Sequence, residues 1–339
     1  MLNSMNGSFD NSLENLAFAV LREYGILPES LSLIQSGGIK TVWKLRSQGR
    51  QLCLKRLKQP IDKALFSVHA QIYIKNSGGK VPEVILNKNR EPIVQFNEQL
   101  FVLYEWIDGS DLNFDLPADL RRAVQGLAYF HTASRGYCPE ANARISTKLG
   151  KWPEQYASMK NKLAAWKDLA GRSCTQPHYH AYFNCAASMI HMAEQALDRI
   201  SRSNYGKLTE EGSPSIVLCH QDYGRGNVVA AADGIYILDL DGVTFDLPSR
   251  DLRKIIGKHA ENKGQWQAGA IMEILGWYME VNTQAADEIE ALYADMTFPH
   301  WFYGLVKNLF QNGKPVKASE IEKMAKLEEA KIKVLDTLK

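Results

Sequence analysis

The chain has 339 residues, of which 45% are apolar and 23% charged, a composition typical of a globular protein long enough for two domains of ordinary size. Its 40 basic and 38 acidic residues leave a net charge of +2. This near balance excludes the strongly positive electrostatic potential that drives nonspecific binding to nucleic acids and membrane surfaces. Five cysteines without a Cys-x-x-Cys pair argue against a structural zinc site and a disulfide framework.

The N-terminal sequence does not have the pattern of a secretory signal, because Asp10 and Glu14 precede the first basic residue, Arg22. No uncharged apolar run approaches the roughly 18 residues of a membrane span. We therefore expect a protein that is made and kept in the cytosol, with neither nucleic acid nor a membrane as its partner.

The first hundred residues predict a small sheet with helices. Apolar residues at helical spacing over 11–24 predict an amphipathic helix that Gly25 ends. Three short strands are expected within 31–46 and 51–57, a helix over 64–75, and two more strands over 81–86 and 100–106. These elements predict a β-rich first domain.

The pattern changes near Gly109, after which helical spacing dominates. Helices are expected over 120–134, 154–171 and 182–201 and in the charged last stretch, 314–339. Strand signals shrink to 216–219 and 234–240. The sequence therefore predicts an α+β protein with a small antiparallel-sheet N-lobe over residues 1–108 and a larger, mainly helical C-lobe over residues 109–339.

The most informative motif is His-x-Asp-x-x-x-x-Asn, formed by His220, Asp222 and Asn227. Phosphoryl transfer needs a carboxylate that accepts the proton of the attacking hydroxyl, and oxygen ligands that hold magnesium on the phosphates. Asp222 suits the first role and Asn227 the second. Taken singly, each is equally well explained as a turn residue beside Gly224 or Gly226, so the prediction rests on their combination.

Asp239 follows an apolar strand 12 residues after Asn227, and a short hairpin would return it to the same place as a second magnesium ligand. Asp241 would share its side of the strand if the strand continued that far. Either carboxylate suits a metal, and Asp239 aligns better with the motif.

Lys55 lies in an apolar strand about 17 residues after Gly38, where a kinase lysine reaches the nucleotide phosphates. An edge-strand lysine is its plain structural interpretation. Gly37 and Gly38 would let the backbone approach a phosphate, although a Gly-Gly turn between strands is common and the full Gly-x-Gly-x-x-Gly motif is absent.

With these residues assembled, the chain resembles the aminoglycoside phosphotransferase and choline kinase superfamily, and more closely its CotS-type spore-coat branch. The resemblance spans nearly the whole chain and rests on these segments: Leu54–Arg56, Leu103–Gly109, Gly126–Ser134, Lys148–Trp152, His220–Asn227 and Leu238–Leu252. It implies a protein-kinase-like bilobal fold with a nucleotide-binding N-lobe and a C-lobe that holds the catalytic loop, the metal site and the acceptor-binding helices.

The resemblance also implies a site and a setting. ATP would lie against the backbone of Glu105, Trp106 and Ile107, with Lys55 on its phosphates, Mg²⁺ on Asn227 and Asp239, and Asp222 as catalytic base. Asp251 would brace the catalytic loop. The acceptor, a small molecule or glycan, would bind among residues 147–167 and 298–310, where an aromatic pocket and an aromatic core are alternatives for these residues: Trp152, Tyr156, Trp301, Phe302 and Tyr303. Other spore-coat proteins are the implied partners, and the cytoplasm of a sporulating mother cell, or the spore coat, is the implied location.

One departure from active relatives concerns the partner of Lys55. They pair this lysine with a glutamate of the N-lobe helix, but no acidic residue lies between Asp62 and Glu83 here, and Ser67, His69 and Gln71 occupy the expected place. Two functions therefore remain open: an ATP- and magnesium-dependent kinase, and a weak or inactive kinase-like coat-assembly protein. A third, in which Asp239 and Asp241 form the Asp-x-Asp motif of a glycosyltransferase, leaves Asp222 and Asn227 unexplained.

Overall fold

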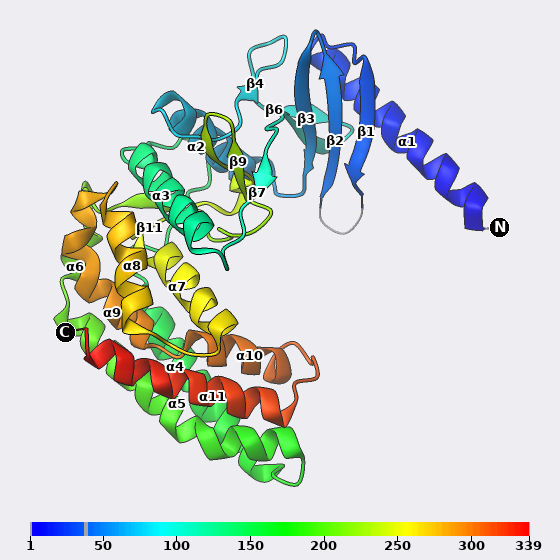
Figure 1. Cartoon of the computed structure of the whole chain (residues 1–339). Coiled ribbons are helices and arrows are strands. Elements are labelled where there is room, and N and C mark those ends of the chain that lie inside the picture. The colour runs from blue at the N-terminus through cyan, green and yellow to red at the C-terminus, as the bar shows by residue number, and fades with distance from the viewer. Residues whose placement is uncertain (1, 37–39, 339) are drawn as a thin grey trace. The chain divides into compact units, whose positions relative to one another are not determined.

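The computed structural model describes residues 2–36 and 40–338 (Figure 1). The chain forms two compact units, each assembled from separate segments. Unit 1 comprises Met1–Asn113, Tyr129–Ser146 and Gly224–Val243, and unit 2 comprises Phe114–Ala128, Thr147–Tyr223 and Thr244–Lys339. Within the described ranges, no helix has both the length and the apolar character needed to cross a membrane. The domain boundary at residue 109 stays a prediction.

An antiparallel sheet with strand order β1-β2-β3-β6-β4 forms the centre of unit 1, and β5 pairs with β6 as well (Figure 1). The strands are β1 Ser30–Gln35, β2 Thr41–Ser47, β3 Arg50–Leu57, β4 Val84–Ile85, β5 Val94–Phe96 and β6 Gln99–Glu105. The predicted strands are thus present, with β4 shorter than expected. The sequence prediction missed β5, which has only three residues.

Helices cover both faces of this sheet. Helix α1 (Leu2–Glu23) packs Ala17, Val20 and Leu21 against one face, in a cluster with Trp43 and Leu54. Helix α2 (Ile61–Asn76) packs against the opposite face, in a cluster with Leu57, Val102 and Tyr104. Because successive strand residues alternate between faces, Lys55 of β3 points to the α2 side of the sheet.

A second, smaller sheet with the order β10-β9-β7 completes unit 1. It consists of β7 (Ser110–Asp111), β9 (Val228–Ala231) and β10 (Gly234–Ile237). The strand predicted over 234–240 is partly wrong: β10 ends at Ile237, and a short 3₁₀ helix, η1 (Leu240–Gly242), follows. Asp241 therefore does not share a strand face with Asp239, as the sequence pattern had suggested.

Unit 2 is mainly helical. Its helices are α4 Trp152–Arg172, α5 Pro177–Arg202, α6 Tyr205–Leu208, α7 Ser249–Lys263, α8 Ala268–Met279, η2 Thr283–Glu288, α9 Ile289–Thr297, α10 His300–Phe310 and α11 Ala318–Asp336. A short two-stranded pair joins β8 (Val217–Cys219) to β11 (Thr244–Asp246). Helix α3 (Pro117–Ser134) contributes residues to both units. An antiparallel sheet in the N-terminal part and helices in the C-terminal part confirm the predicted α+β class.

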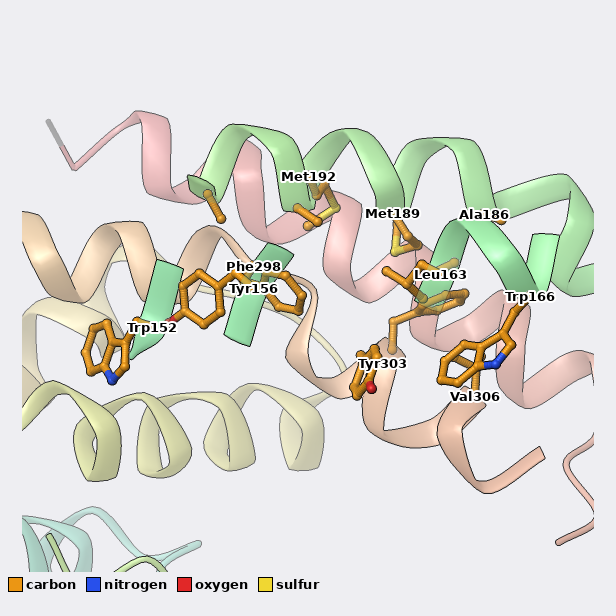
Figure 2. Packing of buried hydrophobic residues seen from close by; sticks show 14 of the residues in the cluster. Trp152, Tyr156, Leu163, Trp166, Ala186, Met189, Met192, Phe298, Tyr303 and Val306 are labelled. Atoms are coloured by element: carbon orange, nitrogen blue, oxygen red, sulfur yellow. The ribbon is translucent and has the colours of Figure 1, made fainter. Parts of the chain in front are cut away.

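The aromatic side chains considered for an acceptor pocket are mostly core (Figure 2). Trp152, Tyr156 and Phe302 are exposed by only 1%, 3% and 0%. The Tyr156 ring stacks on Phe298 with centroids 4.8 Å apart, and the Trp152 ring stacks on Tyr205 at the same separation. Of the two alternatives, the structure therefore supports the aromatic core, which joins α4 and α5 to α10 and α11.

Gly257 of α7 provides a test of this packing. A Cβ atom at Gly257 would lie 1.6 Å from the Trp301 ring, whereas Gly276 of α8 faces open space. We expect Gly257→Ala to lower the free energy of unfolding by about 1–3 kcal/mol, because the indole has to move out of a packed site. Gly276→Ala, the matched control, should raise stability by roughly 0.5–1 kcal/mol. Urea denaturation measures both changes, and equal effects would contradict the close α7–α10 packing.

Candidate functional site

Unit 1 contains a cavity of about 260 Å³ between the sheet and the β9–β10 segment. It has apolar walls, and a few polar side chains converge on it. Its lining residues are Ile34, Gln35, Lys40, Val42, Cys53, Lys55, Gln71, Pro82, Tyr104, Glu105, Trp106, Ile107, Gly226, Asn227, Leu238, Asp239 and Leu240. Such a combination is typical of a small-molecule or cofactor site.

Lys55 forms the electrostatic centre of this cavity. Its Nζ lies 2.8 Å from Asp239 Oδ1 and 2.7 Å from Asp241 Oδ1, and only 9% of its side chain is exposed. Burial alone would lower the pKa of Lys55, but the Asp241 and Asp239 carboxylates outweigh burial and raise it. Lys55 is therefore a fully charged ammonium group held between two carboxylates, which excludes the edge-strand interpretation.

Lys40 is a member of the site that the sequence analysis missed. Its Nζ forms an ion pair with Asp239 Oδ2 and lies 3.9 Å from Asp241 Oδ2. The sequence offered one signal, since Lys40 comes two positions after Gly38 in the segment expected to meet phosphate. Gly37 and Gly38 themselves lie outside the described residues. Lys40 and Lys55 thus form a cluster of two ammonium groups with the carboxylates of Asp239 and Asp241.

The β9–β10 hairpin brings Asn227 and Asp239 to the same cavity, as the sequence predicted. Val228 pairs with Ile237, and Leu238 N donates a 2.9 Å hydrogen bond to Asn227 O. Asp239 adopts a left-handed backbone conformation, with φ 61° and ψ 64°. The chain therefore turns away from the direction of strand β10 at this residue. Burial raises the pKa of Asp239, but Lys55 and Lys40 outweigh this effect and lower the pKa to about 2.

The side chains of α2 that occupy the place of the missing acid have other partners. Gln71 Nε2 donates to Pro82 O over 2.7 Å, and Ser67 Oγ accepts from Gln59 Nε2 over 2.9 Å. His69 Nδ1 lies 3.7 Å from Glu140 Oε1. Gln71 alone of these three lines the cavity. The carboxylates that contact Lys55 therefore come from the segment after β10.

Glu105, the last residue of strand β6, lines the cavity together with Trp106 and Ile107, and their contact with a nucleotide base stays a prediction. Two backbone N–H groups of this segment are used inside the sheet. Glu105 N donates to Glu83 O over 2.9 Å and Trp106 N donates to Gln51 O over 3.0 Å. These two N–H groups therefore already have main-chain partners within unit 1.

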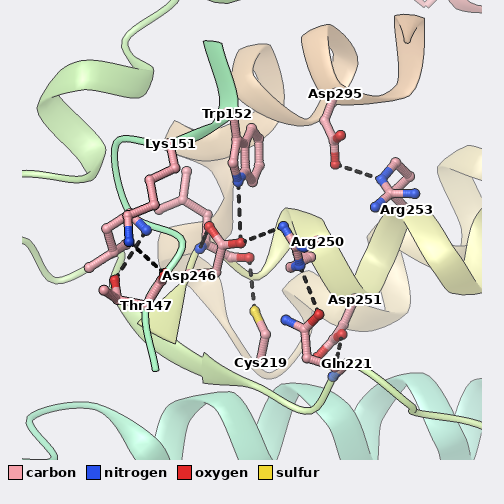
Figure 3. Close-up of polar contacts among 12 residues, drawn as sticks. Thr147, Lys151, Trp152, Cys219, Gln221, Asp246, Arg250, Asp251, Arg253 and Asp295 are labelled. Carbon is pink, nitrogen blue, oxygen red and sulfur yellow. Dashed lines mark hydrogen bonds and ion pairs between the residues drawn. The ribbon is translucent and has the colours of Figure 1, made fainter. Parts of the chain in front are cut away.

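The loop that carries Asp222 is braced within unit 2 (Figure 3). Asp251 is fully buried at the start of α7, and its carboxylate accepts backbone N–H groups of His220, at 2.5 Å, and Gln221, at 3.0 Å. Asp222 N donates to His220 Nδ1 over 3.3 Å. Asp251 thus has the bracing role that the resemblance implied.

Gln221 has a left-handed backbone, with φ 74°, which is uncommon for a residue other than glycine. Arg250 Nε donates to its side-chain oxygen over 3.0 Å, and Lys254 Nζ donates to its carbonyl oxygen. These bonds, together with those of Asp251, hold the backbone conformation that immediately precedes Asp222. Side chains of α7 therefore bind the main chain of both His220 and Gln221, the two residues that precede Asp222 in the motif.

Three comparisons extend this picture. The family described as "Phosphotransferase enzyme family" matches residues 30–292 of the chain. That range is more than half of the sequence. The chain belongs to this phosphotransferase family. It is also 22% identical to spore coat protein S of Bacillus subtilis (strain 168) over 330 residues, which cover 96% of this chain and 94% of that protein.

Solved structures of phosphotransferases share the fold. An aminoglycoside phosphotransferase from Alicyclobacillus acidocaldarius superposes with a TM-score of 0.77 at 17% identity, covering 94% of both chains. A microcompartment-associated aminopropanol kinase gives 0.60 at 13% identity over 95% of this chain and 96% of that one. An amicoumacin kinase gives 0.59 at 13% identity over 99% and 96%. At these identities the likeness shows the fold alone, which is that of protein-kinase-like phosphotransferases.

Within this phosphotransferase fold, the structure brings together most of the residues selected from the sequence. Lys55, Asn227, Asp239 and residues 105–107 line one cavity of unit 1. The carboxylate of Asp239 and the amide of Asn227, which both line the cavity, offer the hard oxygen atoms that Mg²⁺ prefers, so this donor pair fits a magnesium ion. Asp222 belongs to unit 2 and follows the braced loop.

Proposed function

We propose that this protein is an ATP- and magnesium-dependent phosphotransferase that acts on a hydroxyl group of a small molecule or glycan. The observation that carries the proposal is the contact between Lys55 and Asp239 in a cavity that Asn227 also lines. A buried lysine beside two carboxylates and an amide is the combination needed to hold a nucleotide triphosphate together with its metal. The family membership supports the same reaction class.

In this proposal each residue has one task. Lys55 neutralises the inner phosphates, Asn227 and Asp239 hold Mg²⁺, and residues 105–107 line the adenine site. Magnesium, when bound, would neutralise negative charge on the phosphates. Lys40, which pairs with Asp239, would supply a second ammonium group for the phosphates if Asp239 held the metal.

Asp222 is the proposed base for the transfer step. The acceptor oxygen forms a bond to the γ-phosphorus, the bond from that phosphorus to its bridging oxygen breaks, and ADP leaves with the bonding electrons. The hydroxyl proton passes to the Asp222 carboxylate. The bonds from Asp251 to the loop fix the backbone before Asp222, so the carboxylate is positioned before the acceptor arrives.

Relatives of the same fold support a nucleotide and a small acceptor. One solved structure is a spectinomycin phosphotransferase in complex with ADP and spectinomycin, and another is an amicoumacin kinase in complex with AMP-PNP and Ca²⁺. The similarity to spore coat protein S supports an association with spore-coat formation in the mother cell of a sporulating bacterium. Glycans and other coat components are acceptors and partners compatible with that setting.

A second candidate function is a kinase-like coat-assembly protein with weak or absent turnover. Two observations favour it: the similarity to a coat protein, and the absence of any acidic residue between Asp62 and Glu83. In this case the cavity would bind a nucleotide or nothing, and the protein would act through its surface.

Thermal unfolding in the presence of ATP tests whether the cavity binds the nucleotide, and ATP hydrolysis by the wild type then distinguishes turnover from binding alone. A ligand that binds only the folded protein at about 100 times its Kd adds about 2.7 kcal/mol to stability. We expect millimolar ATP with Mg²⁺ to raise Tm by several degrees, and ATP with EDTA to raise it less. Magnesium alone is the matched control, and Asp239→Asn should remove the difference between the two ATP conditions. An unchanged Tm at millimolar ATP and Mg²⁺ would leave only the assembly function.

A further inference from the structure

Lys55 points to the side of the sheet that α2 covers, yet its acidic partners come from elsewhere. Helix α2 has no acidic residue after Asp62, and Gln71, its cavity-lining side chain, is bonded to Pro82 O. The two carboxylates that contact Lys55 belong to the turn after β10. One of them, Asp239, is the proposed magnesium ligand, whereas Asp241 has no task in the proposed reaction.

We propose that Asp241 is the positioning residue for Lys55, and that it replaces a helix acid in holding the lysine toward the nucleotide phosphates. This inference rests on the proposed function and adds to it a residue whose role neither the family match nor the sequence motif assigns. Asp241 itself would touch neither the nucleotide nor the metal. It would act through Lys55 alone.

The local backbone explains why Asp241 reaches the lysine. Asp239 has a left-handed conformation, and the 3₁₀ helix η1 starts at the next residue. Leu240 is buried between the two aspartates, so its side chain anchors the turn in the hydrophobic interior. Both carboxylates consequently meet the same ammonium group, at 2.8 and 2.7 Å, although they are two residues apart on a segment that is no longer a strand.

The sharing of contacts separates the roles of the two aspartates. Both aspartates form ion pairs with Lys40 and Lys55, but Asp239 accepts hydrogen bonds from both lysines, whereas Asp241 accepts one from Lys55 and lies 3.9 Å from Lys40 Nζ. Once Asp239 turns its oxygens to a divalent cation, Lys55 keeps a carboxylate partner only if Asp241 remains in place. The Asp241 side chain is 26% exposed and that of Lys55 9%, so the pair is partly shielded from solvent.

Two sets of variants test the inference. The first is a double-mutant cycle of Lys55→Met, Asp241→Asn and the variant with both changes. The urea concentration at the midpoint of unfolding is measured for each, without nucleotide. The second adds Gln71→Glu to Asp241→Asn, which moves the carboxylate to the α2 position that lines the same cavity. Asp233→Asn is the matched control, because Asp233 lies on the same hairpin and pairs with the exposed Lys80.

Intrinsic ATP hydrolysis, with water as acceptor, supplies the kinetic measurement. We expect Asp241→Asn to lower kcat by about 10- to 100-fold, the usual cost of a mispositioned group, without changing the Mg²⁺ concentration for half-maximal activity. Gln71→Glu should restore part of the lost activity, but not the urea midpoint, because the new carboxylate cannot donate to Pro82 O as the Gln71 amide does. Asp233→Asn should behave as the wild type in both measurements.

Several results would overturn the inference. If the effects of Lys55→Met and Asp241→Asn on the urea midpoint are additive, Asp241 does not interact with Lys55 in solution. This result does not depend on whether the protein turns over ATP. A shifted Mg²⁺ requirement without rescue by Gln71→Glu would make Asp241 a metal ligand instead. If Asp241→Asn lowers the urea midpoint but leaves kcat unchanged, the pair has only a structural role. Failure of the proposed function gives another result: ATP neither stabilises the wild type nor is hydrolysed by it. The double-mutant cycle in urea would still measure the interaction between Lys55 and Asp241.

Discussion

Replacing Asp222 by asparagine is expected to lower phosphoryl transfer by about 10²–10⁴-fold, the range for loss of a positioned general base. The amide keeps the size of the side chain and cannot take the hydroxyl proton. The braced loop, whose backbone is held by Asp251, should be unaffected because its bonds involve main-chain atoms of His220 and Gln221. Intrinsic ATP hydrolysis measures the loss, and thermal unfolding with ATP and Mg²⁺ verifies that binding is retained.

The exposed Asp168 of α4 provides the matched control, since Asp168→Asn makes the same chemical change at the surface of the same unit. It should leave hydrolysis and ATP stabilisation as in the wild type. Equal rates for Asp222→Asn and the wild type would show that Asp222 is not the base. A loss of ATP stabilisation together with activity would instead assign Asp222 to nucleotide binding.

The largest expected loss of stability comes from Asp295→Asn in unit 2. Asp295 is buried, and its carboxylate lies 2.8 Å from Arg253 Nε and 2.7 Å from His300 Nε2, and also accepts a hydrogen bond from the Tyr156 hydroxyl. Burial would raise the pKa of Asp295, but Arg253 and His300 outweigh this effect and lower the pKa far below its usual range. Burial and Arg253 in turn lower the pKa of His300 to about 4, so His300 is neutral at pH 7.

The asparagine leaves Arg253 as a buried cation without its counter-charge, and breaking a buried pair in this way costs about 3–5 kcal/mol. Denaturation in urea, extrapolated to water, gives the change in the free energy of unfolding. Asp198→Asn is the control, because the 2.7 Å pair of Asp198 with Arg202 lies on the exposed face of α5 and is expected to contribute at most about 1 kcal/mol. A loss below about 1 kcal/mol for Asp295→Asn would contradict a charged, paired Arg253.

Local patterns made much of the site predictable. Asn227 and Asp239 are joined by a short hairpin, so their spacing in the sequence was enough to predict that they meet. Alternation of apolar residues located β3 and hence Lys55. Helical spacing located α1, α2, α4 and α5, while the extra turns at their ends depend on tertiary contacts that periodicity does not report.

Other features were out of reach for physical reasons. The Lys55–Asp241 contact joins residues 186 positions apart and depends on the left-handed backbone at Asp239, which an apolar run ending in two aspartates does not reveal. Lys40 was missed because its only sequence signal is a pair of neighbouring glycines. The aromatic residues of α4 and α10 have the same helical spacing in a core as in a pocket, and only their burial decides between the two.

The discontinuous composition of unit 1 has a consequence for how the protein is made. Lys55 leaves the ribosome 184 residues before Asp239, and α2 has no acidic residue after Asp62 in its first turn. At a synthesis rate of about 5–20 residues per second, Asp239 and Asp241 are made roughly 10–40 s after Lys55. The sheet and its two helices can form early, but this unit closes only when Gly224–Val243 has emerged. A nascent chain stalled before that segment would expose an unneutralised ammonium group inside its future ligand cavity.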